Sequence, residues 1–248
     1  TKDSTVVNYN SSIAVTPEDL KIIQDTLLDY IENLEIKIKN VESTTIITEL
    51  LNEFTKTNII DNIFLIANRE DMDYAPHLQK TLKHFNIPKE NLVYIDTTAG
   101  QAETAAIAIK KFKTKLKDDP FLIHNIDTLL YNRDFNQIKK SLEKNDGYID
   151  IFESSNPAYC YLLSNDANEV YEIAEKILIS DMASSGLYGF TNSKIFLDNF
   201  DNEIFISEIY KKIIKSGKIL SGILYDESST VVLGTPVEYV NKTNLLIK

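Results

Sequence analysis

Three short apolar segments alternate with two helix-like segments in the second quarter of the chain, and this rhythm constrains the fold more than any other feature. The apolar segments are Asn62–Asn68, Leu92–Thr97 and Phe121–Ile126. Residues 75–85 and 100–112 between them have helical composition. Strands and helices that alternate at this spacing form right-handed βαβ units. The sequence therefore predicts an α/β fold with an open, mostly parallel, twisted sheet flanked by helices, of the Rossmann type.

The region before this core has its own pattern. Thr16 and Pro17 have the residue types of a helix start, and the apolar spacing continues to about Leu34. The segment Leu34–Lys39 alternates like a strand, and residues 44–54 have the pattern of a second helix. We expect a helical addition that also contributes a first strand and helix to the core.

The pattern changes after Gly147, where short strands follow one another with little helix between them. This arrangement predicts an antiparallel extension of the sheet. No linker rich in Pro, Gly or Ser interrupts the chain. We therefore expect an N-terminal part at residues 1–57 and one α/β domain at residues 58–248.

Charge and composition narrow the function classes. The net charge of −11 argues against binding a nucleic-acid backbone, which requires a cationic face. Arginine occurs only at positions 69 and 133, so bidentate phosphate recognition is available at two places at most. No apolar run approaches the roughly 18 residues of a membrane span, and the first residues lack the layout of a signal peptide. We expect a cytoplasmic protein, or one whose targeting segment has been removed.

The segment FLIHNIDTLLYNRDF, residues 121–135, ends an apolar strand on polar residues. Asn125 and Asp127 follow the strand. Ligands of open parallel sheets bind beyond the carboxyl ends of the strands, and a carboxylate there can hold Mg²⁺ against a substrate phosphate. The alternative interpretation is a capping or turn-forming aspartate.

Two further segments carry polar residues where strands end. Gly100 and Gln101 open a helix, whose free N–H groups favour anions or base carbonyls. Glu175 and Lys176 end a strand, where they could contact sugar hydroxyls and a phosphate. An ordinary strand-to-helix turn and an exposed ion pair are the respective alternatives. The single cysteine, Cys160, excludes an internal disulfide and has the pattern of a buried apolar residue.

Five segments in order carry a resemblance to a known family. They are GQAET, FLIHNIDTLL, DGYIDIFESSNPAYCYLL, EVYEIAEKILISDMASSGLYGF and VVLGTPVEYV. Together they resemble the sugar-phosphate nucleotidyltransferases, most closely the branch found in bacterial capsule and surface-polysaccharide biosynthesis. The similarity extends from about Asn62 to Val240.

The resemblance implies a fold shared with GT-A-type enzymes and a Mg²⁺-dependent reaction. A sugar-1-phosphate would attack the α-phosphate of a nucleoside triphosphate and release pyrophosphate, mainly through positioning and charge neutralisation. The resemblance also implies roles for individual residues. Asp127 would bind the Mg²⁺. The nucleotide would contact Gly100, Gln101 and Asn125, and the sugar phosphate would contact Tyr159, Glu175, Lys176 and Gly186.

Two departures from the family pattern leave the activity open. Family members begin with a strand and a glycine-rich loop that cradles the triphosphate through backbone N–H groups, whereas the first glycine here is Gly100. The second metal-binding aspartate of many members falls at Val232, although Asp226 or Glu227 could replace it. We interpret the chain as a divergent member. The alternative is a native segment that precedes Thr1.

Three functions stay open on this basis. The first is a nucleotidyltransferase that acts on a sugar phosphate or a similar small phosphate. The second is a catalytically inactive relative that binds nucleotide or sugar-nucleotide as a sensor or as the subunit of a partner enzyme. The third is a GT-A-type glycosyltransferase, with Asn125-Ile126-Asp127 as its metal motif. A homo-oligomer is compatible with each.

Overall fold

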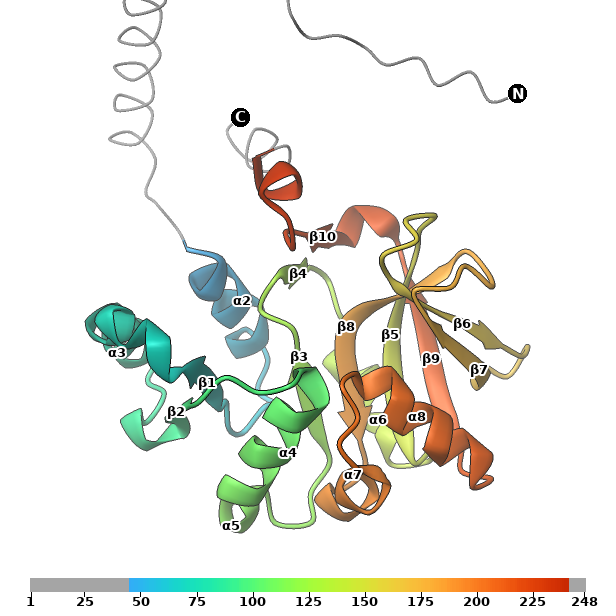
Figure 1. Cartoon of the computed structure of the whole chain (residues 1–248), viewed down its shortest axis with the longest axis horizontal. Coiled ribbons are helices and arrows are strands. Elements are labelled where there is room, and N and C mark those ends of the chain that lie inside the picture. The colour runs from blue at the N-terminus through green and yellow to red at the C-terminus, as the bar shows by residue number, and fades with distance from the viewer. Residues whose placement is uncertain (1–44, 241–248) are drawn as a thin grey trace, which may run out of the picture. The chain divides into compact units, whose positions relative to one another are not determined.

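The computed structural model describes residues 45–240 (Figure 1). The chain divides into two units, residues 1–45 and residues 46–248, and the described helices and strands all belong to the second unit. The helix predicted from Thr16 and the strand predicted at Leu34–Lys39 lie outside the described residues. None of the helices within 45–240 is long and apolar enough to span a membrane.

The first half of this unit has the predicted strand–helix rhythm. Strands β1 (Leu65–Asn68) and β2 (Leu92–Ile95) pair in parallel, with Leu65 opposite Leu92. The elements around them are the helices α2 (Ile46–Thr55) and α3 (Ala75–His84) and the 3₁₀ turns η1 (Arg69–Tyr74) and η2 (Lys89–Asn91). Leu51 of α2 and Leu82 of α3 form a cluster with Ile87, and Leu65 of β1 and Leu92 of β2 pack against it.

After β2, the chain forms an alanine-rich helix that packs on the main hydrophobic core. Helix α4 (Gln101–Lys111) buries Ala102, Ala105, Ala106 and Ile109, whose i, i+3, i+4, i+7 spacing forms one apolar stripe. The following elements are α5 (Lys113–Leu116), β3 (Phe121–His124), β4 (Thr128–Leu130) and α6 (Phe135–Leu142). Asp134 starts α6, because its carboxylate accepts hydrogen bonds from two free N–H groups of the first turn.

A six-stranded sheet in the order β3-β8-β5-β9-β7-β6 forms the centre of the unit. The prediction that the sheet is mostly parallel was wrong: of its described pairs only β5–β9 is parallel. The loop between β6 and β7 is too short to hold a crossover helix, and such a loop connects antiparallel neighbours. The prediction of antiparallel strands after Gly147 was right, but antiparallel pairs make up most of the described sheet instead of an extension of it. The strands are β5 (Gly147–Glu153), β6 (Cys160–Ser164), β7 (Glu169–Glu175), β8 (Met182–Phe190) and β9 (Leu220–Tyr225).

Part of this sheet closes on itself. Strand β6 pairs with β7 and also with β8, where Tyr161 lies opposite Ala183. The strands β8, β5, β9, β7 and β6 thus form a small barrel, and β3 extends the sheet beyond it. A separate two-stranded ladder joins β4 to β10 (Thr230–Val232), which follows the 3₁₀ turn η3 (Glu227–Ser229).

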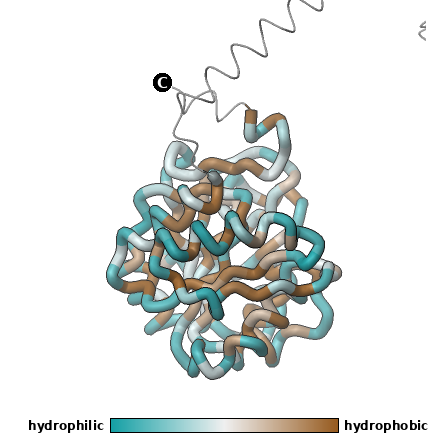
Figure 2. The backbone as a smooth tube through the Cα atoms, turned by 90° about the vertical axis from the view of Figure 1, so that its left-hand side faces the viewer, coloured by the Kyte–Doolittle hydropathy of each residue, from teal (hydrophilic) through white to brown (hydrophobic). Residues whose placement is uncertain are grey.

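The core lies on both faces of β5 and β8. The helices α7 (Ser193–Asn199) and α8 (Ile206–Lys215) pack with α4 on one face, and α6 covers the other. Tyr210 on α8 donates to the backbone oxygens of Tyr148 and Gly189 and so ties the helix to two strands. Figure 2 shows apolar strands running behind more polar helices.

Phe190 provides a test of this core. It is fully buried and packs against Phe121, Phe196 and Tyr210. We expect Phe190→Ala to lower the free energy of unfolding by about 3–5 kcal/mol, because it removes a large apolar side chain and leaves a cavity. The exposed Tyr74 is the control, and Tyr74→Ala should cost no more than about 0.5 kcal/mol. Chemical denaturation measures both, and equal losses would contradict this description of the core.

Candidate functional site

One pocket of about 410 Å³ gathers most of the residues singled out in the sequence. Its lining includes residues just after β3, at the start of β6, at the end of β7 and in the middle of β8, together with the start of α4 and the segment after β10. Seven of the eight residues expected to bind ligand line it, and these are Gln101, Asn125, Asp127, Tyr159, Glu175, Lys176 and Gly186. Gly100 does not line the pocket. It packs closely against the backbone of Ile204, which a Cβ would approach to 2.7 Å.

Asp127 lies between β3 and β4, and backbone contacts on both sides hold it. The N–H of Leu233 donates to the carbonyl oxygen of Asp127 at 2.7 Å, and the Nε2 of His124 lies 2.8 Å from the carbonyl oxygen of Thr128. Burial lowers the pKa of His124 to about 4, so its imidazole is neutral near pH 7. Because Nε2 faces a carbonyl oxygen, Nε2 carries the proton.

Gly234 leaves open space beside the Asp127 carboxylate. A Cβ at Gly234 would lie 3.2 Å from Oδ2 of Asp127 and 3.8 Å from Oε2 of Glu238. The two carboxylates therefore flank the same glycine. The absence of a side chain there leaves Asp127 open to the pocket.

Asn125 is fixed by Gly186 and Gln101. The N–H of Asn125 donates to the carbonyl oxygen of Gly186 at 3.1 Å, and the side-chain amide of Gln101 donates to that of Asn125. Gly186 has φ +88°, and a Cβ there would lie 2.7 Å from the Asn125 amide nitrogen. Glycine at position 186 is thus required both by its left-handed backbone and by the close amide.

Glu175 and Lys176 stand at the end of β7 on another wall of the pocket. The Glu175 carboxylate accepts a hydrogen bond from Ser207 at 2.7 Å. The Nζ of Lys176 lies 5.0 Å from the centre of the Phe205 ring, a cation–π contact. Of the described residues that line the pocket, only Lys176 carries a positive charge.

The sequence pattern did not identify Glu238, which lines the pocket beyond Gly234. Its carboxylate accepts hydrogen bonds from the N–H and hydroxyl of Thr235 at 2.9 Å and from the Tyr159 hydroxyl at 3.3 Å. Thr235-x-x-Glu238 is a capping box, which the sequence could have revealed as a helix start but not as a pocket wall. Burial, followed by the charge of Glu238, raises the pKa of Tyr159 to about 12.

Cys160 lines the same wall as a protonated thiol. Burial, followed by the charge of Glu175, raises its pKa to about 12. A thiolate is the nucleophilic form of cysteine. Cys160 therefore fits the expected role of a buried apolar residue rather than that of a nucleophile.

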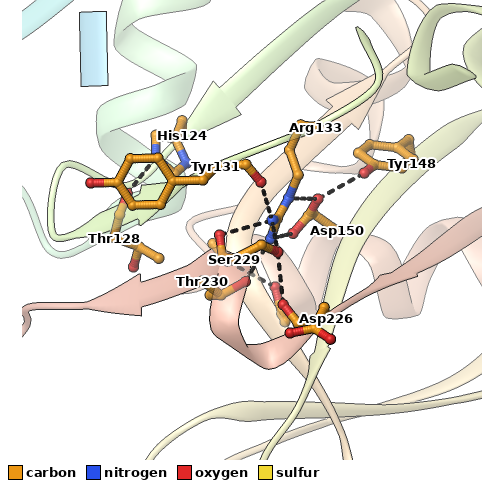
Figure 3. Close-up of polar contacts among 11 residues, drawn as sticks. His124, Thr128, Tyr131, Arg133, Tyr148, Asp150, Asp226, Ser229 and Thr230 are labelled. Carbon is orange, nitrogen blue, oxygen red and sulfur yellow. Dashed lines mark hydrogen bonds and ion pairs between the residues drawn. The ribbon is translucent and has the colours of Figure 1, made fainter. Parts of the chain in front are cut away.

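The two arginines have different environments. Arg69 is exposed at the end of β1 and pairs with Asp96 at 2.7 Å. Arg133 is buried, and its guanidinium donates to the Asp150 carboxylate through two bonds of 2.9 Å (Figure 3). It also donates to the Ser229 carbonyl oxygen and to the hydroxyls of Ser229 and Thr230. Arg133 is therefore a structural residue that joins η3 and β10 to β5, and it has no donor free for a phosphate.

The described residues contain no group of three or more His, Cys, Asp or Glu side chains that could hold a metal. Asp226, the expected second metal ligand, starts η3 by accepting from the N–H of Ser228 at 2.8 Å. Neither Asp226 nor Glu227 lines the pocket that contains Asp127. Asp127 and Glu238 are the carboxylates that lie beside Gly234 there.

Comparisons with known proteins identify the fold. The structure resembles the nucleoside-diphosphate-sugar pyrophosphorylase of Vibrio cholerae with a TM-score of 0.70 and 23% sequence identity, covering 82% of this chain and 88% of that one. It also resembles the inositol-1-phosphate CTP transferase of T. maritima, with a TM-score of 0.60 and 14% identity over 80% of this chain and 81% of that one. A Bacillus anthracis structure described as a glucose-1-phosphate thymidylyltransferase gives a TM-score of 0.62 and 17% identity, over 81% of this chain and 80% of that one.

These likenesses establish the fold of sugar-phosphate nucleotidyltransferases, as the sequence resemblance implied. The sequence matches no family model and no curated protein. These three structures are each less than 25% identical to this chain, so they identify the architecture and not the reaction.

Two glycines with left-handed backbones test the packing around Asn125. Gly217 has φ +79° with no atom within 4 Å of a Cβ, whereas Gly186 has φ +88° and a crowded Cβ position. We expect Gly217→Ala to cost about 1–2 kcal/mol from backbone strain alone. Gly186→Ala should cost more, by about 1–3 kcal/mol, because the methyl group must displace Asn125. Urea denaturation measures both, and equal costs would show that Asn125 is not held against Gly186.

The buried ion pair is tested by removing one partner. Asp150→Asn should destabilise the protein by about 3–5 kcal/mol, because it leaves the Arg133 guanidinium buried without a counter-charge. The exposed pair Lys194–Asp198 supplies the control, and Lys194→Met should change the stability by less than about 1 kcal/mol. A small effect of Asp150→Asn in thermal and chemical denaturation would show that this network does not hold β4 and β10 in place.

Proposed function

We propose that the pocket binds a nucleoside triphosphate and a sugar phosphate, or a similar small phosphate, and transfers the nucleotidyl group between them. The observation that carries this proposal is the meeting of Asp127, the Gln101–Asn125 pair and the Glu175–Lys176 pair in one pocket. These residues come from distant parts of the sequence. They match the family resemblance one by one, and the fold is of the same kind.

The residues near Gly234 fit a magnesium ion. Mg²⁺ is held by one or two carboxylates together with substrate phosphates rather than by a full cage of side chains. Asp127 and Glu238 flank Gly234 and would supply those oxygens. When bound, the ion would neutralise the charge of the phosphates. Glu238 replaces Asp226 in this proposal, because Asp226 starts η3 instead of lining the pocket.

The other side chains would orient the two substrates. The amides of Gln101 and Asn125 can hydrogen-bond the edge of a base, Glu175 can accept from sugar hydroxyls, and Lys176 can pair with the sugar phosphate. An oxygen of the sugar phosphate would attack the α-phosphorus, and pyrophosphate would leave with the electrons of the broken bond. The chain's contribution is then mainly positioning. A role in capsule or surface-polysaccharide synthesis rests on the sequence resemblance.

Substitution of Asp127 tests the proposed reaction. The protein is incubated with each nucleoside triphosphate, Mg²⁺ and a panel of sugar-1-phosphates, and pyrophosphate release is measured. Asp127→Asn should reduce the rate at least about 100-fold, as loss of one electrostatic group does in other sites, with an unchanged melting temperature. The surface variant Asp198→Asn should retain full activity. The absence of pyrophosphate across the panel, with folded protein, would refute nucleotidyl transfer.

The alternative is a catalytically inactive relative that binds nucleotide or sugar-nucleotide. A specific observation favours it: within residues 45–240 the first glycine is Gly100, and Lys176 is the one cation in the pocket lining. Three acidic side chains, Asp127, Glu175 and Glu238, line the same pocket. In this case sugar-nucleotides would raise the melting temperature, whereas triphosphates with Mg²⁺ would neither raise it nor be consumed. Sugar transfer to an acceptor without pyrophosphate release would instead indicate the glycosyltransferase.

A further inference from the structure

The helices α4 and α8 begin side by side, and two hydrogen bonds join them there. The N–H of Ala102 donates to the carbonyl oxygen of Ile204 at 3.0 Å. The N–H of Ile206, the first residue of α8, donates at 3.3 Å to the side-chain Oε1 of Gln101, the first residue of α4. The free N–H groups of a first helical turn need acceptors, and the Gln101 side chain supplies one to α8.

The bond from Ile206 determines which way the Gln101 amide points. A backbone N–H can only donate, so the atom that it meets is the amide oxygen of Gln101, and the amide nitrogen lies on the other arm. That nitrogen, Nε2, donates to the side-chain Oδ1 of Asn125. Hydrogen-bond partners decide the orientation of a side-chain amide, and here a backbone donor decides it.

The orientation of the Asn125 amide follows in the same way. Its Oδ1 accepts from Gln101, so its Nδ2 occupies the other arm. A Cβ at Gly186 would lie 2.7 Å from that nitrogen, and both Asn125 and Gly186 line the pocket. Within residues 45–240, no acceptor engages Nδ2. The hydrogen-bond chain from Ile206 through Gln101 to Asn125 therefore leaves the NH₂ group of Asn125, and not its oxygen, for the pocket.

We propose that Gln101 is a positioning residue, which turns the Asn125 amide so that its NH₂ group faces the pocket, and that Asn125 thereby selects a ligand atom that accepts a hydrogen bond. Phosphate oxygens and the carbonyl oxygens of a base are such atoms. A ligand group that can only donate would leave both groups unpaired, and sites built around a polar group reject such ligands strongly. Of the two amides in the proposed function, Asn125 then contacts the ligand and Gln101 acts through it.

The direction of the Asn125 amide matters because the pocket is acidic. Among the described lining residues only Lys176 is cationic, whereas Asp127, Glu175 and Glu238 are acidic. The NH₂ group of Asn125 adds a neutral donor, two positions along the chain from Asp127. With the opposite orientation, Asn125 would present a further acceptor to a ligand that is itself rich in acceptors.

Gln101→Glu reverses the hydrogen-bond chain with almost no change of shape. A carboxylate accepts from the N–H of Ile206 as the amide does, but it cannot donate to Asn125. Asn125 then donates its NH₂ group to the carboxylate and turns its oxygen to the pocket. Because position 101 is the first of α4, where a negative charge is favourable, we expect the melting temperature not to fall.

Asn156→Asp is the matched control for the added charge. Asn156 lines the same pocket, and its side-chain oxygen accepts from the N–H of Ala158 at 3.1 Å, which a carboxylate also does. The substitution therefore adds the same charge to the pocket lining and leaves the hydrogen-bond chain unchanged.

The direction of the chain is measured in the full-length protein without ligand, by NMR hydrogen exchange of the side-chain amides. In the unsubstituted protein, the bonded proton of the Gln101 NH₂ group should exchange at least about tenfold more slowly than the protons of the Asn125 NH₂ group. In Gln101→Glu, the Asn125 NH₂ group should become the slow one. Slow exchange of the Asn125 NH₂ group in the unsubstituted protein would overturn the proposal.

Recognition is measured with each nucleoside triphosphate and Mg²⁺, or with glucose 1-phosphate, added one at a time so that no transfer occurs. At least one probe should shift the Asn125 NH₂ signal. Its dissociation constant should rise at least about tenfold in Gln101→Glu, the effect of losing a hydrogen bond to a charged group, and less than about threefold in Asn156→Asp, whose exposed charge is screened by solvent. A response to triphosphates alone assigns the acceptor atom to the nucleotide, and a response to glucose 1-phosphate alone assigns it to the sugar phosphate.

Equal losses of affinity in the two variants, or no shift of the Asn125 signal with any probe, would overturn recognition by Asn125. Gln101→Met is a second variant that adds no charge, and it serves if Gln101→Glu does not fold. It releases the Asn125 amide into both orientations, so the affinity should fall about twofold, in proportion to the fraction that presents the NH₂ group. Unchanged affinity in Gln101→Met would contradict the positioning role.

The inference rests on the proposed function for its choice of probes, and the two fail in different ways. Binding that depends on Gln101, without pyrophosphate release from any combination of substrates, would refute the transfer and leave the role of Gln101 intact. Pyrophosphate release that is the same in Gln101→Glu and in the unsubstituted protein would support the transfer and refute the role of Gln101.

Discussion

The position of the pocket depends on the buried pair Arg133–Asp150. Asp150 lies on β5 in the centre of the sheet, and the Arg133 guanidinium donates hydrogen bonds to Asp150, Ser229 and Thr230. A guanidinium with five donors is suited to joining several segments at once. The pair thereby fixes η3 and β10 against the sheet, and the β10–β4 ladder in turn determines where Asp127 and Gly234 meet. A charge pair that does not line the pocket thus determines the geometry of the pocket.

The sequence predicted the elements better than their pairing. Local periodicity identified β1, β2 and α4, because each carries its own apolar pattern. The sequence did not predict that β8 lies beside β3, since this pairing depends on barrel closure, which involves residues far apart. Arg133 was a candidate for phosphate recognition, and only its partner Asp150, 17 positions away, reveals its structural role. Glu238 was missed because its helix-capping pattern carries no signal for a pocket.

The pocket combines residues of two kinds. Gln101, Asn125 and Gly186 constrain one another through short contacts, so their positions are set before any ligand arrives. Asp127, Glu175 and Glu238 add negative charge that only Lys176 offsets among the described lining residues. A phosphorylated ligand therefore needs further positive charge, from a metal ion or from residues beyond those described. Because of this electrostatic imbalance, the fold by itself does not establish which reaction the pocket of this chain supports.

Strand β8 belongs to both the barrel and the extended sheet. Its first half pairs with β6 at Ala183, and its second half pairs with β3 from Leu187 to Phe190. The register against β5 shifts between these halves, near Ser185. The first half of β8 therefore connects to the wall of the pocket that carries Glu175, and its second half connects to the wall that carries Asn125. The register shift lies between these two halves. A movement of one wall relative to the other must therefore bend β8 near this shift, where Gly186 has the left-handed backbone that a bend requires.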